Sequence, residues 1–195
     1  MDVINLIMSD HRAVEKIFDK LEKVEKDQQA ERLQLLQQVQ ALLVPHSKAE
    51  ESIVYPAMVK LLPSIAEDVE EGVSEHHHVE DLFTQVLANP NDPGVDAMIA
   101  GFIAEIKHHV EEEETELLPR FRKAADATLL HDLAVQFAAG KAQVLTGLGL
   151  APEEFIAPSL IDLSKEQLVD RAKAIDLDAP TSLTKNELVT QLLSS

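Results

Sequence analysis

The sequence contains no cysteine. This absence excludes disulfides, thiolate zinc sites, iron–sulfur clusters and a cysteine nucleophile. Basic residues are also scarce, because 17 lysines and arginines stand against 35 aspartates and glutamates, for a formal net charge of -18. Binding to nucleic-acid phosphates or to an anionic membrane depends on basic side chains, so neither partner is expected. A chain this acidic is suited to attracting cations.

Glycine is rare as well, with six in 195 residues, while helix-forming residues are abundant. This balance favours helices over strands. No segment is long and apolar enough to span a bilayer. The opening stretch, MDVINLIMSDHR, lacks the basic start and the small-residue cleavage site of a signal peptide. It is typical of a helix, and a cytoplasmic location is expected.

Apolar residues recur at helical spacing in five stretches. Helices are predicted over about residues 2–26, 27–63, 64–88, 95–125 and 128–145. Pro45 and Pro56 are expected to kink or divide the second helix. Four amphipathic helices with short connections predict an all-α fold, an up-down-up-down four-helix bundle extended by the fifth helix.

The composition changes after the fifth helix. The stretch GLGLAPEEFIAPS has the glycine and proline content of a linker. Two short helical patterns follow, and capping boxes begin them at Ser164 and Thr184. The predicted domains are a bundle at 1–150 with its core at 1–125, a linker at 151–158 and a small helical module at 159–195.

A short phrase of the sequence occurs twice. SDHRAVEKIF, residues 9–18, and SEHHHVEDLF, residues 74–83, share Ser, His, Val, Glu and Phe at the same places. HSKAEESIVYP, residues 46–56, and HVEEEETELLP, residues 109–119, share His, Glu, Glu and Pro. Two helix pairs, each with His on its first helix and His-x-x-x-Glu on its second, therefore form a duplicated unit.

The repeat pairs His11 with His76 and leaves the next two histidines unmatched. Helical phase supports the same choice, because His76 falls near the middle of the apolar face of its helix. His77 and His78 point away from that face by more than a right angle, at about 100° per residue. His76 is therefore the expected inward residue of the triplet.

Six polar residues are expected to point into the bundle. A His-x-x-x-Glu pair places an imidazole and a carboxylate one helical turn apart on one face. Buried carboxylates are strongly destabilising unless they are paired or bind cations. The predicted metal ligands are His11, His46, Glu50, His76, His109 and Glu113.

The ligand set selects the metal. Six ligands exceed the needs of one tetrahedral zinc ion, and four imidazoles are too rich in nitrogen for calcium or magnesium. The set suits two redox-capable first-row ions, and iron fits best. We expect two iron ions (Fe2+/Fe3+), bridged by Glu50 and Glu113 and by an oxo, hydroxo or water ligand.

The series His, His-x-x-x-Glu, His, His-x-x-x-Glu resembles the hemerythrin-like domain, also called the HHE cation-binding domain. The segments DHR, HSKAEESIVYP and HHVEEEETELLP carry the resemblance, which covers roughly residues 1–125 and extends toward 145. It implies a non-haem di-iron centre held by the six residues named above. It also implies that the centre binds dioxygen, nitric oxide or peroxide, or responds to iron and oxygen levels.

One departure from the family's oxygen carriers bears on function. The carriers place a second His one turn after the third-helix ligand and an Asp on the fourth helix, where this chain has Glu80 and Glu113. A site richer in carboxylates favours the ferric state and binds oxygen less reversibly, so simple oxygen transport is not expected.

Two other functions stay open on the sequence. One is a di-iron enzyme that decomposes peroxide or repairs nitrosative damage with the same ligands. The other is a metal-stabilised scaffold that acts through its C-terminal module.

Several polar residues near the motifs are expected to lie outside the ligand set. His77, His78, His108 and His131 are expected on the surface or beside the site, and the rest of EEEETE on a solvated face. Glu80 is weighed as a further ligand or as a partner of a coordinating imidazole. Tyr55 is expected to pack, with contact to the site as the alternative.

Residues 159–195 resemble helix–extended–helix modules such as the SAP and Rho N-terminal types. The residues expected to form their small core are Leu168, Ala172, Leu177, Leu183, Leu188 and Leu192. Such modules often bind nucleic acid, but acidic residues outnumber basic ones in this copy. Docking to a protein partner or self-association is therefore the predicted role.

Overall fold

The computed structural model describes residues 2–25, 27–90, 92–151, 164–174, 177, 180–185, 187–188 and 191. Over these residues the chain is helical and contains no strand, which confirms the predicted all-α class. No helix in this part of the chain is long and apolar enough to cross a membrane.

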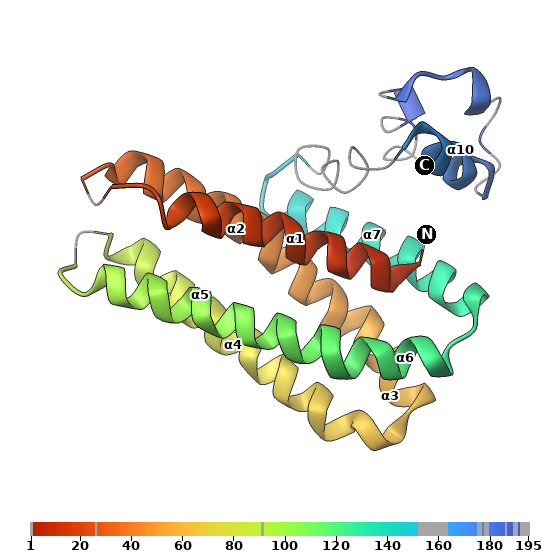
Figure 1. Cartoon of the computed structure of the whole chain (residues 1–195), viewed down its shortest axis with the longest axis horizontal. Coiled ribbons are helices and arrows are strands. Elements are labelled where there is room, and N and C mark those ends of the chain that lie inside the picture. The colour runs from red at the N-terminus through yellow and green to blue at the C-terminus, as the bar shows by residue number, and fades with distance from the viewer. Residues whose placement is uncertain are drawn as a thin grey trace.

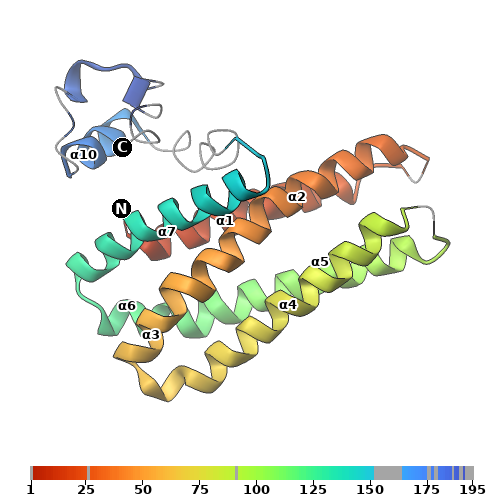
Figure 2. The same ribbon diagram turned by 180° about the vertical axis from the view of Figure 1, so that it is seen from behind.

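The bundle is built from two helical hairpins and one further helix (Figures 1 and 2). Helix α1 pairs with α2, and α4 pairs with α5, while α7 packs across α1 and α2. The long helices are α1 (Val3–Leu21), α2 (Gln29–Ala49), α4 (Ala66–Ala88), α5 (Val95–Glu112) and α7 (Ala127–Gly147). Shorter elements complete the second and fourth stretches: η1 (Glu50–Val54), α3 (Tyr55–Leu61), η2 (Pro63–Ile65), η3 (Glu113–Leu117) and α6 (Leu118–Ala124).

Side-chain caps begin the first and last bundle helices. The Asp2 carboxylate accepts a hydrogen bond from the Asn5 backbone N–H, and Asp126 accepts one from Leu129. These bonds satisfy N–H groups that a helix start would otherwise leave without a partner.

Two π-helical turns, η1 and η3, interrupt the helices at equivalent places. In each, a backbone N–H bonds five residues back, from Tyr55 to Glu50 and from Leu118 to Glu113. Pro56 and Pro119 follow at once; a proline has no N–H, and its ring clashes with the carbonyl four residues earlier. Widening the preceding turn relieves that conflict. The α2 helix, by contrast, continues through Pro45.

A polar layer divides the bundle core between two apolar clusters. Along α1, for example, Ile7 belongs to one cluster and Val14 to the other, with Asp10 and His11 buried between them. The same order holds on the other helices of the two hairpins. The apolar clusters supply the burial energy that holds the helices together, and the polar layer is trapped between them.

Helix α7 packs mainly against the hairpin of α1 and α2 and its continuation η1. It approaches closely because Gly140 faces η1; a Cβ at this position would lie 2.8 Å from Ile53 Cδ1. Phe137 is buried in the same interface and packs edge-on against the His46 ring, with 5.7 Å between centroids. The predicted fifth helix therefore seals one half of the duplicated unit.

The C-terminal segment holds α10 (Lys165–Ala174) and a 3-10 turn, η4 (Pro180–Ser182). Both capping boxes form, with Ser164 bonded to Gln167 and Thr184 bonded to Glu187. Five of the residues expected in the small core cluster together: Leu168, Ala172, Leu177, Leu183 and Leu188. Leu192 and linker residues 152–158 lie outside the described residues, and the domain boundary stays a prediction.

Candidate metal centre

All six expected ligands lie in the polar layer and are buried. Glu50 has 0% of its surface exposed and Glu113 1%, while the four histidines have 3–7%. Their nitrogen and oxygen atoms fall into two groups whose members lie within 4.8 Å of one another. One group contains His11, His46, Glu50 and Glu113, and the other contains Glu50, His76 and His109. Glu50 belongs to both.

The two groups fit a metal because five of their inward atoms make no hydrogen bond within the protein. In the second group, Nε2 of His76 and Nε2 of His109 contact each other at 3.0 Å. His11 Nε2, His46 Nε2, both carboxylate oxygens of Glu50 and Glu113 Oε2 are buried without a hydrogen bond. Buried polar atoms without partners are rare and destabilising. Metal ions held among these atoms would satisfy all five, and carboxylate oxygens with imidazole nitrogens are common ligands of first-row metals.

Four carboxylates outside the ligand groups fix the orientation of the four imidazoles. The Nδ1 atoms lie 2.7–3.2 Å from these oxygens: His11 from Glu114, His46 from Asp10, His76 from Glu51 and His109 from Glu75. An ionised carboxylate only accepts hydrogen bonds, so each Nδ1 carries a proton. In the neutral imidazole, Nε2 is then left free to bind a metal.

Sequence reasoning missed these four carboxylates, although the repeat contained the signal. Asp10 and Glu75 each precede the first histidine of a unit, and Glu51 and Glu114 each follow the inward glutamate. The expectation that the rest of EEEETE is solvated is wrong for Glu114, because it bonds to His11 and only 14% of its side chain is exposed. Its second oxygen binds Arg12.

Lys141 of α7 adds a buried cation on one side of the site. It bonds to the Asp10 carboxylate, which also holds His46. Burial raises the pKa of Asp10, but the positive charge of Lys141 and the contact with His46 outweigh it and lower the value to about 2. Asp10 is therefore ionised. Its hydrogen bonds with Lys141 and His46 are strengthened by its negative charge.

The charges inside the site determine whether a proton must leave when a metal ion binds. Burial lowers the pKa of His46, but the Glu50 charge and the bond to Asp10 raise it to about 10 in the metal-free protein. His46 is therefore protonated on both ring nitrogens and positively charged at neutral pH. A metal ion binding at Nε2 would release the proton from that nitrogen.

Tyr55 reaches the site through Glu113. The side chain packs in an apolar cluster, as expected. Its hydroxyl also donates a hydrogen bond to Glu113 Oε1 at 3.1 Å, so the alternative, a contact with the site, is present as well. Burial and the Glu113 charge raise the pKa of Tyr55 well above its usual value, so the hydroxyl stays protonated. The hydrogen bond leaves Oε2 of Glu113 free to face His11 Nε2, 3.4 Å away.

The family model of the hemerythrin HHE cation binding domain matches residues 2–121. These residues span both hairpins and all six clustered side chains. The chain belongs to this family. The hemerythrin-like resemblance of the sequence is thereby confirmed, and the His/Glu groups fit a metal-binding helical bundle.

One curated relative is a protein named DNA nickase from Nostoc sp. (strain PCC 7120). It is 24% identical over 150 residues, which cover 76% of this chain and 42% of the relative. This chain thus matches less than half of that protein's length. No solved structure matches the chain.

The remaining histidines of the hemerythrin-like bundle lie away from the two groups. His77, His78 and His108 have 59%, 60% and 64% of their side chains exposed, and His131 is half-buried on α7. Glu80, weighed as a further ligand, instead bonds to Lys48 at 3.1 Å and joins neither group. In the triplet, only His76 faces the site.

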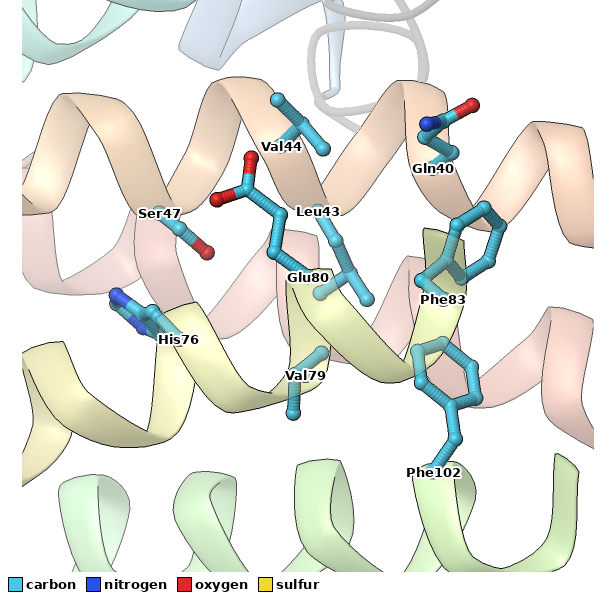
Figure 3. Close-up of a pocket in the computed structure, with 9 residues that line it drawn as sticks. All are labelled: Gln40, Leu43, Val44, Ser47, His76, Val79, Glu80, Phe83 and Phe102. Atoms are coloured by element: carbon cyan, nitrogen blue, oxygen red, sulfur yellow. The ribbon is translucent and has the colours of Figure 1, made fainter. Parts of the chain in front are cut away.

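A small cavity of about 30 Å³ lies beside His76 (Figure 3). Its walls come from α2, α4 and α5 and are mainly apolar, with Leu43, Val79 and Phe83 among them. The volume is enough for roughly one water-sized molecule. A small uncharged molecule can therefore approach the His76 side of the site.

We expect His76→Ala to lose metal and thermal stability, while His77→Ala and His78→Ala retain nearly normal loading. Only the first substitution removes an imidazole from the site. Metal content after dialysis and the melting temperature measure the two effects. An equal loss of metal from all three variants would contradict the assignment.

We expect Lys141→Met to destabilise the fold by about 3–5 kcal/mol, because Asp10 would be left buried without its cation. Lys107→Met is the matched control, since Lys107 pairs with Glu22 at the surface, where a pair contributes about 1 kcal/mol or less. Denaturant unfolding of both variants measures the difference. Equal destabilisation of the two variants would show that the buried Lys141–Asp10 pair contributes no more to stability than the surface pair.

Proposed function

We propose that the bundle holds two iron ions and that this centre binds or senses dioxygen, nitric oxide or peroxide. The observation that carries the proposal is the pair of buried His/Glu groups that share Glu50. A carboxylate that belongs to two ligand groups is suited to bridge two ions. His11 and His46 would hold one ion, and His76 and His109 the other.

The second carboxylate, Glu113, is also proposed as a bridge. It lies in the first group, where Oε2 has no partner. Its Oε1 accepts the Tyr55 hydroxyl, and a carboxylate oxygen retains a further lone pair for a metal. Both proposed bridges begin a π turn, a distortion that is frequent at functional sites.

The environment of the site favours a small, uncharged ligand. Two iron ions would supply electrons and open coordination positions for it. The mainly apolar cavity beside His76, of about 30 Å³, limits the ligand to a very small molecule, and dioxygen and nitric oxide are of this class. Glu80 stands where the oxygen carriers have a second histidine, and it is bonded to Lys48 and joins neither ligand group. The site therefore gains no further imidazole there and stays rich in carboxylate. We therefore propose sensing or reaction rather than oxygen transport.

Tyr55 favours a second candidate, an enzyme that decomposes peroxide or repairs nitrosative damage. Its protonated hydroxyl lies 3.1 Å from Glu113 Oε1, inside the buried layer. A hydroxyl in this position can supply or relay a proton to a reacting group, which peroxide chemistry requires. The same six residues would hold the metal in both candidates.

The name of the Nostoc relative raises phosphodiester cleavage as another possibility, and the charges here argue against it. The chain carries a net charge of -18, and acidic side chains surround the site. Both features repel a nucleic-acid backbone. We therefore do not propose DNA cleavage for this chain.

The experiment is an anaerobic ferrous titration of metal-free protein, followed optically on exposure to dioxygen, nitric oxide and peroxide. We expect two iron ions per chain and a spectral change with at least one of the three. Glu113→Ala should lower the iron content, whereas Glu111→Ala, an exposed neighbour, should not.

Each outcome of this titration selects a function. Rapid peroxide loss that disappears in Glu113→Ala would favour the enzyme. Tight zinc binding without any iron-dependent spectrum would contradict the di-iron proposal and favour the metal-stabilised scaffold.

We further propose that residues 159–195 form a docking or self-association module of the SAP or Rho N-terminal kind. The clustering of Leu168, Ala172 and Leu188 supports a separate small core. A chain ending at residue 150 should then bind iron like the full chain but lose any self-association seen by sedimentation. Unchanged sedimentation together with lost iron binding would instead make the tail part of the bundle.

A further inference from the structure

A second cavity, of about 70 Å³, opens between α4 and the segment formed by α5 and η3. We call it the acidic cavity. Its described lining contains six carboxylates and no lysine or arginine: Asp68, Glu71, Glu75, Glu112, Glu113 and Glu116. His109, Gly72 and Leu117 complete the lining. This opening is chemically unlike the apolar cavity beside His76.

The acidic cavity reaches the candidate metal centre. Its inner wall includes His109 and Glu113, two of the six proposed ligands. Glu113 is 1% exposed, and its Oε2 atom has no hydrogen-bond partner. A buried carboxylate oxygen of this kind is a binding position for a cation arriving from the cavity.

The outer side of the cavity carries a separate cluster of metal-binding groups. Glu75, His108 and Glu112 each place one ligand atom within 4.8 Å of the others. Glu75 also accepts the hydrogen bond of His109 Nδ1 at 2.7 Å. One carboxylate thus links the exposed cluster to a proposed ligand of the buried centre.

The internal repeat shows that this acidity is not a requirement of the scaffold. In the first unit Glu75 and Glu113 have the acidic equivalents Asp10 and Glu50, but the other four carboxylates and Gly72 are replaced by apolar residues. The pairs are Val3 with Asp68, Leu6 with Glu71, Ile7 with Gly72, Ala49 with Glu112 and Ile53 with Glu116. The first unit is covered by α7, whereas the second is open and lined with carboxylates.

Gly72 keeps the inner part of the acidic cavity wide. A Cβ at this position would lie 3.3 Å from the Tyr55 hydroxyl oxygen and 3.5 Å from His109 Cε1. Glycine inside a helix costs about 1 kcal/mol relative to alanine, so its presence in α4 has a structural cost. The space that it leaves lies directly against a proposed ligand.

We propose that the acidic cavity is the route by which divalent cations, ferrous iron in the first instance, reach the buried centre. Glu71, Glu112 and Glu116 would attract the ion from solvent, and Glu75, His108 and Glu112 would hold it briefly. Transfer to His109 and Glu113 would follow. The proposal rests on the function proposed above and adds how the site is filled.

The two cavities then serve different molecules. A carboxylate-lined passage attracts cations and repels anions, because like charges in a low-dielectric cleft repel strongly. The mainly apolar cavity beside His76 has one carboxylate in its lining, Glu80, which is paired with Lys48, so it attracts cations far less and suits an uncharged ligand. Metal loading and ligand access would therefore use separate openings.

The test compares uptake rates in two charge-matched triple variants of the full chain. One is Glu71→Gln, Glu112→Gln and Glu116→Gln, in the cavity lining. The control is Glu67→Gln, Glu70→Gln and Glu111→Gln, exposed on the same two helices but outside the lining. Metal-free protein is mixed anaerobically with Fe2+ and quenched at set times with excess ferrous chelator. The iron retained by the protein is then counted.

We expect the cavity variant to take up iron about tenfold more slowly than wild type, because electrostatic steering changes rates by at least this factor. The control should change less than about twofold. High salt should slow the wild type toward the cavity variant. Equal rates in the two variants, or no change in either, would overturn the proposal.

Final iron content separates this proposal from the function on which it rests. If the cavity is a route, the cavity variant reaches the wild-type iron content at long times. A chain that never retains two iron ions would defeat the di-iron function instead, whatever the rates. Gly72→Ala provides a second measurement, since narrowing the passage should also slow uptake without lowering the final content. Unchanged uptake by Gly72→Ala would argue against passage at this point.

Discussion

The burial of Glu50 and Glu113 in the middle of the bundle is the constraint on which the rest of the structure depends. Two carboxylates without solvent need positive charge or hydrogen-bond donors close by. Four imidazoles face them, and four further carboxylates hold those imidazoles in place. The apolar clusters on either side prevent the layer from relaxing toward water.

The sequence alone was sufficient for the helical class and for the grouping of six side chains. Both follow from periodicity, because the helical repeat of apolar residues places His11 and His76 on inward faces. Long-range partners could not be predicted in this way. Lys141 reaches Asp10 only because α7 folds back across the first hairpin, and no local pattern encodes that contact.

The duplicated unit explains both what is symmetric and what is not. The outer carboxylates recur in both halves, so orientation of the imidazoles is common to the whole layer. The two halves differ in how they are covered. Helix α7 packs over the half that contains His46, whereas a cavity opens beside His109 in the other half. The two ligand groups therefore differ in their access to solvent, and ions held in them would exchange at different rates.

The two π turns give the duplicated unit a common local geometry. A π turn contains one residue more than the α turn it replaces, and in both units it begins at the inward glutamate and ends before a proline. The same distance from glutamate to proline recurs in both units, so each widened turn fixes where the inward carboxylate sits relative to the helix that follows. The two halves of the polar layer therefore share one local geometry, although their surroundings differ.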